Sequence, residues 1–385
     1  MDKKIKVMTV FGTRPEAIKM APVVLELMKY PDEIIPVVTV TAQHREMLDQ
    51  VLNLFKIVPD HDLDIMSAGQ TLFDITSKAL LGLDKVLTEE QPDIVLVHGD
   101  TTTTFAGALA AFYHQTKVGH VEAGLRTRNK FSPFPEEMNR KLTGSLTDLH
   151  FAPTPTAEAN LLSEAVSQDG IYVTGNTVID ALHQTVRSDY EFEDELLKNI
   201  DYKNHRIVLV TTHRRENLGE PMRHVYKALR QLTEEFPDIE VVFPVHRNPK
   251  VREVVNEELG TAERVNLIDP LDYEPFANLM GRSTLILTDS GGVQEEAPAL
   301  GKPVLVLRDT TERPEAVAAG TVKLIGTDRD RVFNEAKLLL TDANEYKRMA
   351  ESCNPYGDGK ASGRIVQAIR CHYGFTTENP DRFEA

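Results

Sequence analysis

The sequence predicts an α/β protein built from two Rossmann-like domains, each a parallel sheet with helices between successive strands. Short runs of β-branched and aliphatic residues alternate with amphipathic stretches of helical period, and this alternation restarts after about residue 175. The chain has 385 residues, of which 41% are hydrophobic and 26% charged, so it is long enough to bury two ordinary cores.

The first half of the chain supplies the first sheet. Strands are expected at residues 6–11, 35–41, 94–97 and 117–122, where the apolar runs are short and rich in Val and Ile. Helices are expected at residues 17–30, 43–55 and 106–113. Strands separated by helices are joined by crossover connections, and that arrangement favours a parallel sheet.

The second half repeats the pattern. Strands are expected at residues 206–211, 240–244, 285–288 and 304–307, with a helix at 222–236. The polar stretch Thr174-Gly175-Asn176 is placed as the boundary, which gives domains of residues 1–175 and 176–362. A last helix, near 363–372 in the segment 363–385, either packs back on the first domain or caps its own.

Composition excludes several classes of protein. The formal net charge of −16 opposes binding to nucleic acid or an anionic membrane. No apolar run approaches the roughly 18 residues of a membrane span, and Arg14 and Glu16 interrupt the apolar stretch that follows the basic start. The two cysteines fit no metal-ligand spacing and indicate a reducing compartment. We therefore expect a soluble, cytoplasmic protein.

The turn after the first strand is the first candidate site. Ligands of open α/β sheets bind where strands end and helix N-termini offer free N–H groups to anions. Gly12 permits a tight turn there, Arg14 can contact a phosphate, and Lys19 adds charge on the following helix. The alternative for Arg14 is an ion pair with a surface carboxylate. A Gly-x-Gly-x-x-Gly fingerprint is absent, which weakens any reading as a dinucleotide site.

A second candidate site is the string 287–297, where a strand ends and a helix begins. Gly291 and Gly292 remove side chains, so backbone N–H groups can approach a pyrophosphate closely. Ser290 offers a hydroxyl, and Glu296 can accept hydrogen bonds from ribose hydroxyls. The alternative is a tight turn with a purely structural role.

Three carboxylates follow strands of the first domain or start a helix there: Asp100, Glu122 and Glu136. In one crevice they would suit proton transfer, because crowding and burial separate their pKa values. Taken singly, Asp100 and Glu136 are also consistent with helix caps.

A basic group follows the first strand of the second domain. His213, Arg214 and Arg215 stand together at its end, and His246 with Arg247 follows another strand. Such a group suits a diphosphate. Because His-Glu-x-x-His and cysteine pairs are missing, no metal site is expected. These residues predict an enzyme that binds a nucleotide diphosphate compound between its domains and uses carboxylates as acid and base, without NAD or metal.

Eight strings, in order along both halves, resemble the non-hydrolysing UDP-N-acetylglucosamine 2-epimerase family: VFGTRPEAIKMAP, TAQHREMLDQVL, VHGDTTT, HVEAGLRT, PFPEEMNR, THRRENLGEP, DSGGVQEEAP and GKPVLVLRDTTERPEA. The resemblance implies a glycosyltransferase-B-like architecture with two domains facing across a cleft, a homodimer, and no cofactor. It also implies interconversion of UDP-N-acetylglucosamine and UDP-N-acetylmannosamine for cell-envelope polysaccharides such as teichoic acid linkage units or capsules.

The resemblance also assigns roles to residues. It implies an acid/base and leaving-group set of Asp100, Glu122, Glu136 and His213. It implies nucleotide-binding positions at Arg14, Lys19, Phe276, Ser290, Gly291, Gly292, Glu296 and Arg313. Arg140 and Arg214 are further substrate-binding candidates, and Arg140 with Asn139 would also orient Glu136.

The expected reaction eliminates UDP, because the C2 proton of the sugar is not adjacent to a carbonyl and is weakly acidic. Loss of UDP from C1 acidifies the C2–H bond, so anti elimination gives 2-acetamidoglucal and UDP. Protonation of the opposite face and return of UDP give the epimer. Alternatives are a hydrolysing relative that releases N-acetylmannosamine and UDP, a glycosyltransferase of the same fold, and a non-catalytic sensor of nucleotide sugars.

Some members of the family carry a second, activating pocket for their own substrate. This chain keeps candidates for that pocket in Gln43, Gln70, Glu136, Arg215 and His246. It has Glu46 where those members have Gln, and Gly69 where they have Arg. Because an Arg contact to a diphosphate is missing and a carboxylate is added, activation by UDP-N-acetylglucosamine is expected to be weak or absent.

Overall fold

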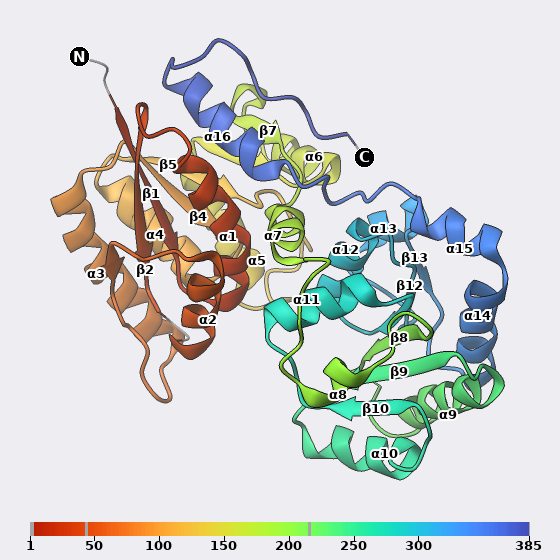
Figure 1. The fold of residues 1–385 in the computed structure, drawn as a ribbon. Helices are drawn as coiled ribbons and strands as arrows, with labels where there is room; N and C mark the ends of the chain where they lie inside the picture. The colour runs from red at the N-terminus through yellow and green to blue at the C-terminus, as the bar shows by residue number, and fades with distance from the viewer. Residues whose placement is uncertain (1–3, 43–44, 215–216, 385) are drawn as a thin grey trace. The chain divides into compact units, whose positions relative to one another are not determined.

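The chain folds into two α/β units in a computed structural model that describes residues 4–42, 45–214 and 217–384 (Figure 1). The first unit comprises Met1–Ala181 and Tyr356–Glu384, and the second Leu182–Pro355. We call them unit 1 and unit 2.

Unit 1 is built on a seven-stranded parallel sheet with strand order β3-β2-β1-β4-β5-β6-β7. Its strands are β1 (Ile5–Phe11), β2 (Ile34–Val40), β3 (His61–Asp62), β4 (Ile94–His98), β5 (Lys117–Val121), β6 (Leu149–Ala152) and β7 (Ile171–Val173). All five residues of β4 are buried, as expected for a parallel strand covered on both faces.

The helices of unit 1 connect these strands. They are α1 (Arg14–Leu27), α2 (Arg45–Phe55), α3 (Leu72–Glu90), α4 (Thr102–Tyr113), α5 (Glu136–Leu146), α6 (Pro155–Ser163), α7 (Thr177–Thr185), which continues past Ala181, and α16 (Ala361–His372). Two begin earlier than the sequence patterns predicted, because Thr13 with Glu16 forms a capping box for α1 and the Thr101 side chain caps α4.

Unit 2 repeats the design with a six-stranded parallel sheet of order β10-β9-β8-β11-β12-β13. Its strands are β8 (Arg206–Thr211), β9 (Ile239–Pro244), β10 (Val265–Ile268), β11 (Leu285–Thr288), β12 (Val304–Val306) and β13 (Val322–Leu324). Its helices are α8 (Glu195–Asn199), α9 (Glu220–Glu235), α10 (Pro249–Leu259), α11 (Tyr273–Arg282), α12 (Gly291–Ala299), α13 (Pro314–Ala319), α14 (Arg329–Thr341) and α15 (Ala343–Ala350).

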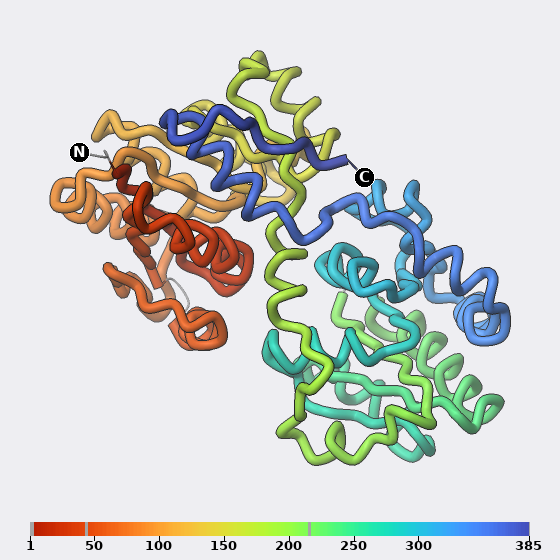
Figure 2. The backbone as a smooth tube through the Cα atoms, turned by 45° about the horizontal axis from the view of Figure 1, so that its top comes forward, coloured from red at the N-terminus to blue at the C-terminus, as the bar shows by residue number. Residues whose placement is uncertain are grey.

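The end of the chain returns to unit 1, where α16 packs against α1 (Figure 2). Arg370 of α16 forms a bidentate ion pair with Glu33, at 2.6 and 2.9 Å. The Asp180 carboxylate accepts the backbone N–H groups of Ala361 and Ser362 at 3.1 and 2.8 Å. These bonds tie the first half of α7 to unit 1, so unit 1 extends to Ala181 and not to the expected residue 175.

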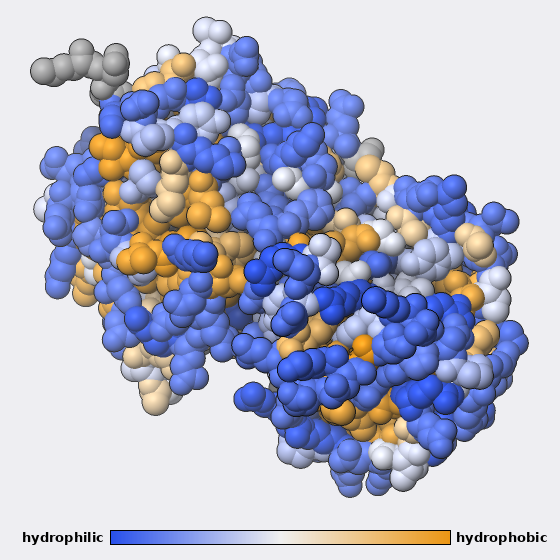
Figure 3. Space-filling view, in the orientation of Figure 1, coloured by the Kyte–Doolittle hydropathy of each residue, from blue (hydrophilic) through white to orange (hydrophobic). Residues whose placement is uncertain are grey.

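Polar side chains cover most of the face drawn in Figure 3, and hydrophobic residues gather mainly over unit 1 around β1 and α1. Within the described part of the chain, no helix is both long enough and apolar enough to cross a membrane.

Candidate functional site

The loops at the carboxyl edge of the unit 1 sheet carry the predicted residues of the first half. The strand order reverses between β1 and β4, and ligands of open α/β sheets bind at such a switch point. Gly12 follows β1, Asp100 lies just after β4 and Glu122 directly follows β5. The three loops therefore start from neighbouring strands.

Glu16, which the sequence analysis did not name as a site residue, connects the first two of these loops. Its buried carboxylate accepts the backbone N–H groups of Gly12 and Thr13 at 3.1 and 2.8 Å, and the Thr101 hydroxyl at 2.7 Å. A Cβ added to Gly12 would stand 1.9 Å from Oγ1 of Thr41, so the position admits only glycine without rearrangement. The Thr-x-x-Glu capping-box pattern is the signal that would have identified Glu16.

Glu122 is the predicted carboxylate that directly follows β5. Its backbone has a φ of +63°, which ends β5 at Val121, one residue before the expected end of the strand. Its Oε2 atom accepts hydrogen bonds from Nζ of Lys19 and, at 2.9 Å, from Nδ2 of Asn176. Burial alone would raise the pKa of Glu122, but the Lys19 ammonium and the nearby His98 outweigh burial and hold that pKa well below its ordinary value. Glu122 is therefore ionised at neutral pH.

Asp100 is paired with a second cation. Arg140 on α5 places Nη2 2.5 Å from Oδ2 of Asp100, and Nδ2 of Asn139 donates to the Asp100 carbonyl at 2.9 Å. Arg140 also contacts the buried Glu137 at 3.3 Å. Burial raises the pKa of Glu137. Hydrogen bonds from the backbone N–H groups of Thr127 and Arg128 outweigh this effect, so the pKa lies below its ordinary value. Arg140 thus contacts Asp100 and Glu137, the residue after Glu136.

The side chains of Glu136 and Arg14 have no hydrogen-bond or ion-pair partner among the residues that the structure describes. Both are half-buried first residues of helices, α5 and α1 respectively. The surface ion pair considered for Arg14 is not present within this part of the chain. Both charged groups are available to a ligand.

In unit 2 the loops after β8 and β11 are joined by Asp289, a fully buried carboxylate that the sequence analysis did not single out. It accepts the backbone N–H groups of His213 and Arg214 at 3.0 and 2.9 Å, and its Oδ1 lies 3.0 Å from Nδ1 of His213. Burial raises the pKa of Asp289, but the His213 ring and these N–H groups lower it below its ordinary value. The carboxylate thereby orients the His213 ring, which stacks on His246 at a centroid distance of 5.9 Å.

The N-terminus of α12 begins at the pair of glycines. A Cβ added to Gly291 or Gly292 would meet nothing within 4 Å, and Ser290 occupies the cap position without a side-chain capping bond. Free N–H groups at such a helix start favour an anion. Burial and the neighbouring Glu296 carboxylate raise the pKa of Tyr273 well above its ordinary value, which places Glu296 beside the start of α11.

The remaining predicted residues fall into three groups. Arg313 pairs with Glu295, and Phe276 lies half-buried on α11 in unit 2. Gln70 accepts a hydrogen bond from the Ser67 backbone at 3.2 Å. Gln43 and Arg215 lie outside the described residues.

No three His, Cys, Asp or Glu side chains in the described ranges are placed to hold a metal ion.

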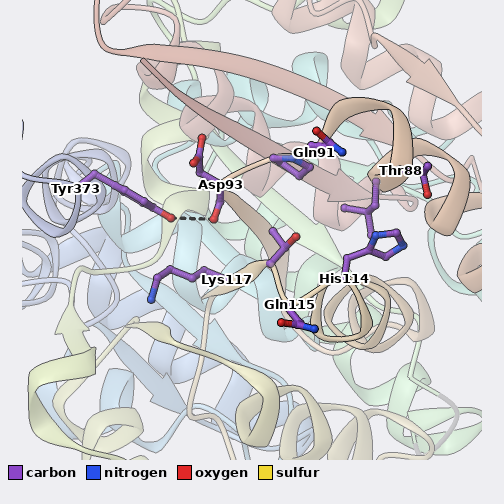
Figure 4. Close-up of a pocket in the computed structure, with 10 residues that line it drawn as sticks. Thr88, Gln91, Asp93, His114, Gln115, Lys117 and Tyr373 are labelled. Atoms are coloured by element: carbon purple, nitrogen blue, oxygen red, sulfur yellow. Dashed lines mark hydrogen bonds between the residues drawn. The ribbon is translucent and has the colours of Figure 1, made fainter. Parts of the chain in front are cut away.

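A pocket of about 590 Å³ opens at the opposite edge of the unit 1 sheet, where β4 and β5 begin (Figure 4). Asp93, His114, Gln115 and Lys117 are among its lining residues, and the Tyr373 hydroxyl donates to the Asp93 carbonyl at 2.8 Å. None of the predicted site residues lines it.

Two Rossmann-like units with polar groups at the carboxyl edges of their sheets define an α/β protein of the glycosyltransferase-B-like class. The crystal structure of the kitacinnamycin glycosyltransferase has a TM-score of 0.64 to this chain at 12% identity, over 94% of this chain and 99% of that one. This likeness is one of fold alone.

The chain belongs to the UDP-N-acetylglucosamine 2-epimerase family, whose sequence model matches residues 26–370. It is 62% identical over 381 residues to UDP-N-acetylglucosamine 2-epimerase of Bacillus subtilis, with 99% of each chain covered. The structure of the Neisseria meningitidis UDP-GlcNAc 2-epimerase bound to UDP-GlcNAc has a TM-score of 0.86 and 50% identity, over 95% of this chain and 99% of that one. The resemblance seen in the sequence motifs is thereby confirmed for the family and the fold.

Proposed function

We propose that the protein interconverts UDP-N-acetylglucosamine and UDP-N-acetylmannosamine without hydrolysing them, and that the product supplies cell-envelope polysaccharide synthesis in the cytoplasm. One observation carries the proposal: Asp100 and Glu122 follow neighbouring strands, and each carboxylate is paired with a cation, Arg140 and Lys19 respectively. Carboxylates that lie beside a switch point and are each paired with a cation suit removal and return of a proton on a bound sugar. The UDP-GlcNAc bound by the Neisseria relative supports this substrate.

The proposed reaction has an elimination step and an addition step. UDP leaves C1 with the electron pair of the C1–O bond, while the C2 proton passes to a carboxylate of unit 1, giving 2-acetamidoglucal. A carboxyl group then protonates C2 on the opposite face, and UDP returns to C1. The start of α12 is suited to the diphosphate because it offers backbone N–H donors to a developing negative charge. His213 is suited to it through its outer ring nitrogen, because Asp289 binds the inner one.

Product analysis with UDP-N-acetylglucosamine as the only substrate tests the function. In heavy water, deuterium should appear at C2 of both substrate and product, since the C2 proton leaves and is replaced from solvent. Added NAD or a chelator should leave the rate unchanged. Free N-acetylmannosamine with UDP would instead indicate hydrolysis, and a need for an acceptor would indicate glycosyl transfer. Full retention of the original C2 hydrogen would rule out elimination.

A homodimer is part of the proposal, supported by an apolar surface on α3 and α4. Phe73 and Leu81 of α3, and Phe112 and Tyr113 of α4, are more than half exposed. Because large apolar side chains on packed neighbouring helices indicate an interaction surface, we assign this surface to a second copy of the chain. Light scattering should give twice the 43.1 kDa chain mass, and Phe73→Glu with Phe112→Glu should give the monomer. A monomeric wild type would contradict the assignment.

Kinetics started from UDP-N-acetylmannosamine test activation through the second pocket. Loss of an Arg–diphosphate contact at Gly69, together with the exposed carboxylate of Glu46, should weaken that pocket about a hundredfold, on the order of 3 kcal/mol. The reverse reaction should therefore follow simple hyperbolic kinetics without a lag. If no turnover is detected until traces of UDP-N-acetylglucosamine are added, the second pocket still binds its activator through other contacts.

A further inference from the structure

The Glu122 carboxylate is held through only one of its two oxygens. Lys19 and Asn176 both donate to Oε2, and Nε2 of His98 lies 3.7 Å from the same atom. Oε1 accepts no hydrogen bond from any described residue, and a Cβ added to Gly99 would stand 3.8 Å from it. One oxygen is therefore occupied by fixed partners, while the other faces the glycine of the β4 loop.

The side chain of Asn176 is fixed in one orientation. It is buried, with 4% of its surface exposed, and its Oδ1 accepts the Val178 backbone N–H at 3.1 Å at the start of α7. Because a backbone N–H can only donate, the amide oxygen must face Val178 and the NH2 group must face Glu122. An NH2 group can only donate in turn, so it stabilises an acceptor carboxylate at Oε2.

The backbone at Asn176 is held by the returning chain. The Asn176 N–H donates to the carbonyl of Tyr356, the first residue of unit 1 after unit 2, at 2.7 Å. Gly175 has a φ of +84°, and a Cβ there would stand 3.4 Å from Gly357 and 3.6 Å from the Phe383 ring. The loop after β7 is therefore fixed by segments from the end of the chain.

We propose that Asn176 is a positioning residue for epimerisation: it fixes Oε2 of Glu122 and thereby leaves Oε1 for the proton exchanged with the sugar. The inference rests on the proposed function, in which Glu122 belongs to the acid/base set. The groups that face Glu122 are Lys19 from α1, His98 from β4 and Asn176 from the loop after β7. Among these three, Asn176 is the only amide, and its substitution leaves both Lys19 and His98 in place.

Asn176→Asp is the discriminating variant. It keeps the Oδ1 acceptor for Val178 but turns the donor into a second carboxylate at the 2.9 Å contact with Glu122. Like charges in contact raise a carboxyl pKa, so the acid limb of the kcat profile should move up by about one pH unit or more. Turnover should fall about tenfold or more, because the carboxylate loses its orientation. The affinity for UDP should stay within about twofold.

Asn266→Asp in unit 2 is the matched control. Nδ2 of Asn266 donates to Oε2 of Glu240 at 2.8 Å, so the substitution creates the same pair of carboxylates away from the site. Its kcat profile against pH should coincide with that of the wild type. A purely general effect of an Asp–Glu pair would instead move both profiles.

A double-mutant cycle with Glu122→Gln completes the test. If Asn176 acts through Glu122, Asn176→Asp should change turnover less than about twofold in the Glu122→Gln background. An unchanged pH profile in Asn176→Asp, or an equal loss of turnover in both backgrounds, would overturn the proposal. Should Asn176→Asp fail to fold, Asn176→Ala must shift the acid limb in the same direction, and an unshifted limb overturns it. If the wild type does not epimerise its substrate, the proposed function is refuted together with the role of Asn176. If the wild type is active and the pH profile or the double-mutant cycle gives the contrary result, only the role of Asn176 is refuted.

Discussion

Glu122→Gln should lower turnover of UDP-N-acetylglucosamine by about 10²-fold or more, the usual scale for loss of a positioned acid or base. The amide keeps the size of the side chain but cannot take or return a proton. It also removes the negative charge that pairs with Lys19 and His98. The loss should appear in kcat, because the proton transfer is part of the transition state and not of ground-state binding.

Steady-state kinetics and UDP titration of the same variant separate the two roles. UDP affinity should change much less than turnover, since the candidate contacts to the diphosphate lie on α12 and the β8 loop of unit 2. Glu90→Gln is the matched control, because Glu90 also pairs with a lysine, Lys6 at 2.7 Å, but lies at the end of α3. A Glu122 variant with weak UDP binding and normal turnover would assign Glu122 to binding.

Much of the fold follows from local patterns in the sequence. The alternation of apolar runs and amphipathic stretches predicts parallel sheets, because such strands are buried on both faces and read as continuous apolar segments. Five strands of two to four residues were not predicted, because runs this short give only a weak periodic signal: β3, β6, β7, β10 and β13. The boundary at Ala181 depends on Asp180 binding the start of α16, a contact across 181 residues that no local pattern contains.

The sequence predicted candidate residues for the site, but it did not predict the hydrogen-bond and ion-pair partners of those residues. Their positions at strand ends made Asp100, Glu122 and His213 candidates, because ligands bind at the carboxyl edge of such sheets. Lys19 was predicted as an anion contact from its place on α1, whereas its partner in the structure is Glu122, 103 residues away. Asp289 lay within a quoted motif, but its role appears only when β8 and β11 become neighbours. Pairings of this kind depend on the fold and not on spacing.

Unit 1 should lose about 4 kcal/mol of unfolding free energy between pH 7.5 and pH 5, because two buried histidines stay neutral in the fold. Burial lowers the pKa of His120 to about 3 and that of His150 to about 4. In the unfolded chain both titrate near the ordinary value of about 6.5. As the pH falls below that value, the two rings become protonated in the unfolded chain but stay neutral in the folded protein. This difference lowers the free energy of unfolding by about 2 kcal/mol per ring at pH 5.

Denaturant unfolding followed at pH 7.5, 6.5, 5.5 and 5 measures this loss. The carboxylates whose pKa the fold lowers, such as Glu122 and Asp289, lose their stabilisation only below about pH 4.5, so the histidines dominate the upper window. His150→Gln should remove about half of the pH dependence whatever its effect on stability at pH 7.5, while His224→Gln on the exposed face of α9 should leave it intact. A free energy of unfolding that stays constant from pH 7.5 to 5 would mean that the rings are protonated without cost, and hence that water or a carboxylate reaches them in the folded protein.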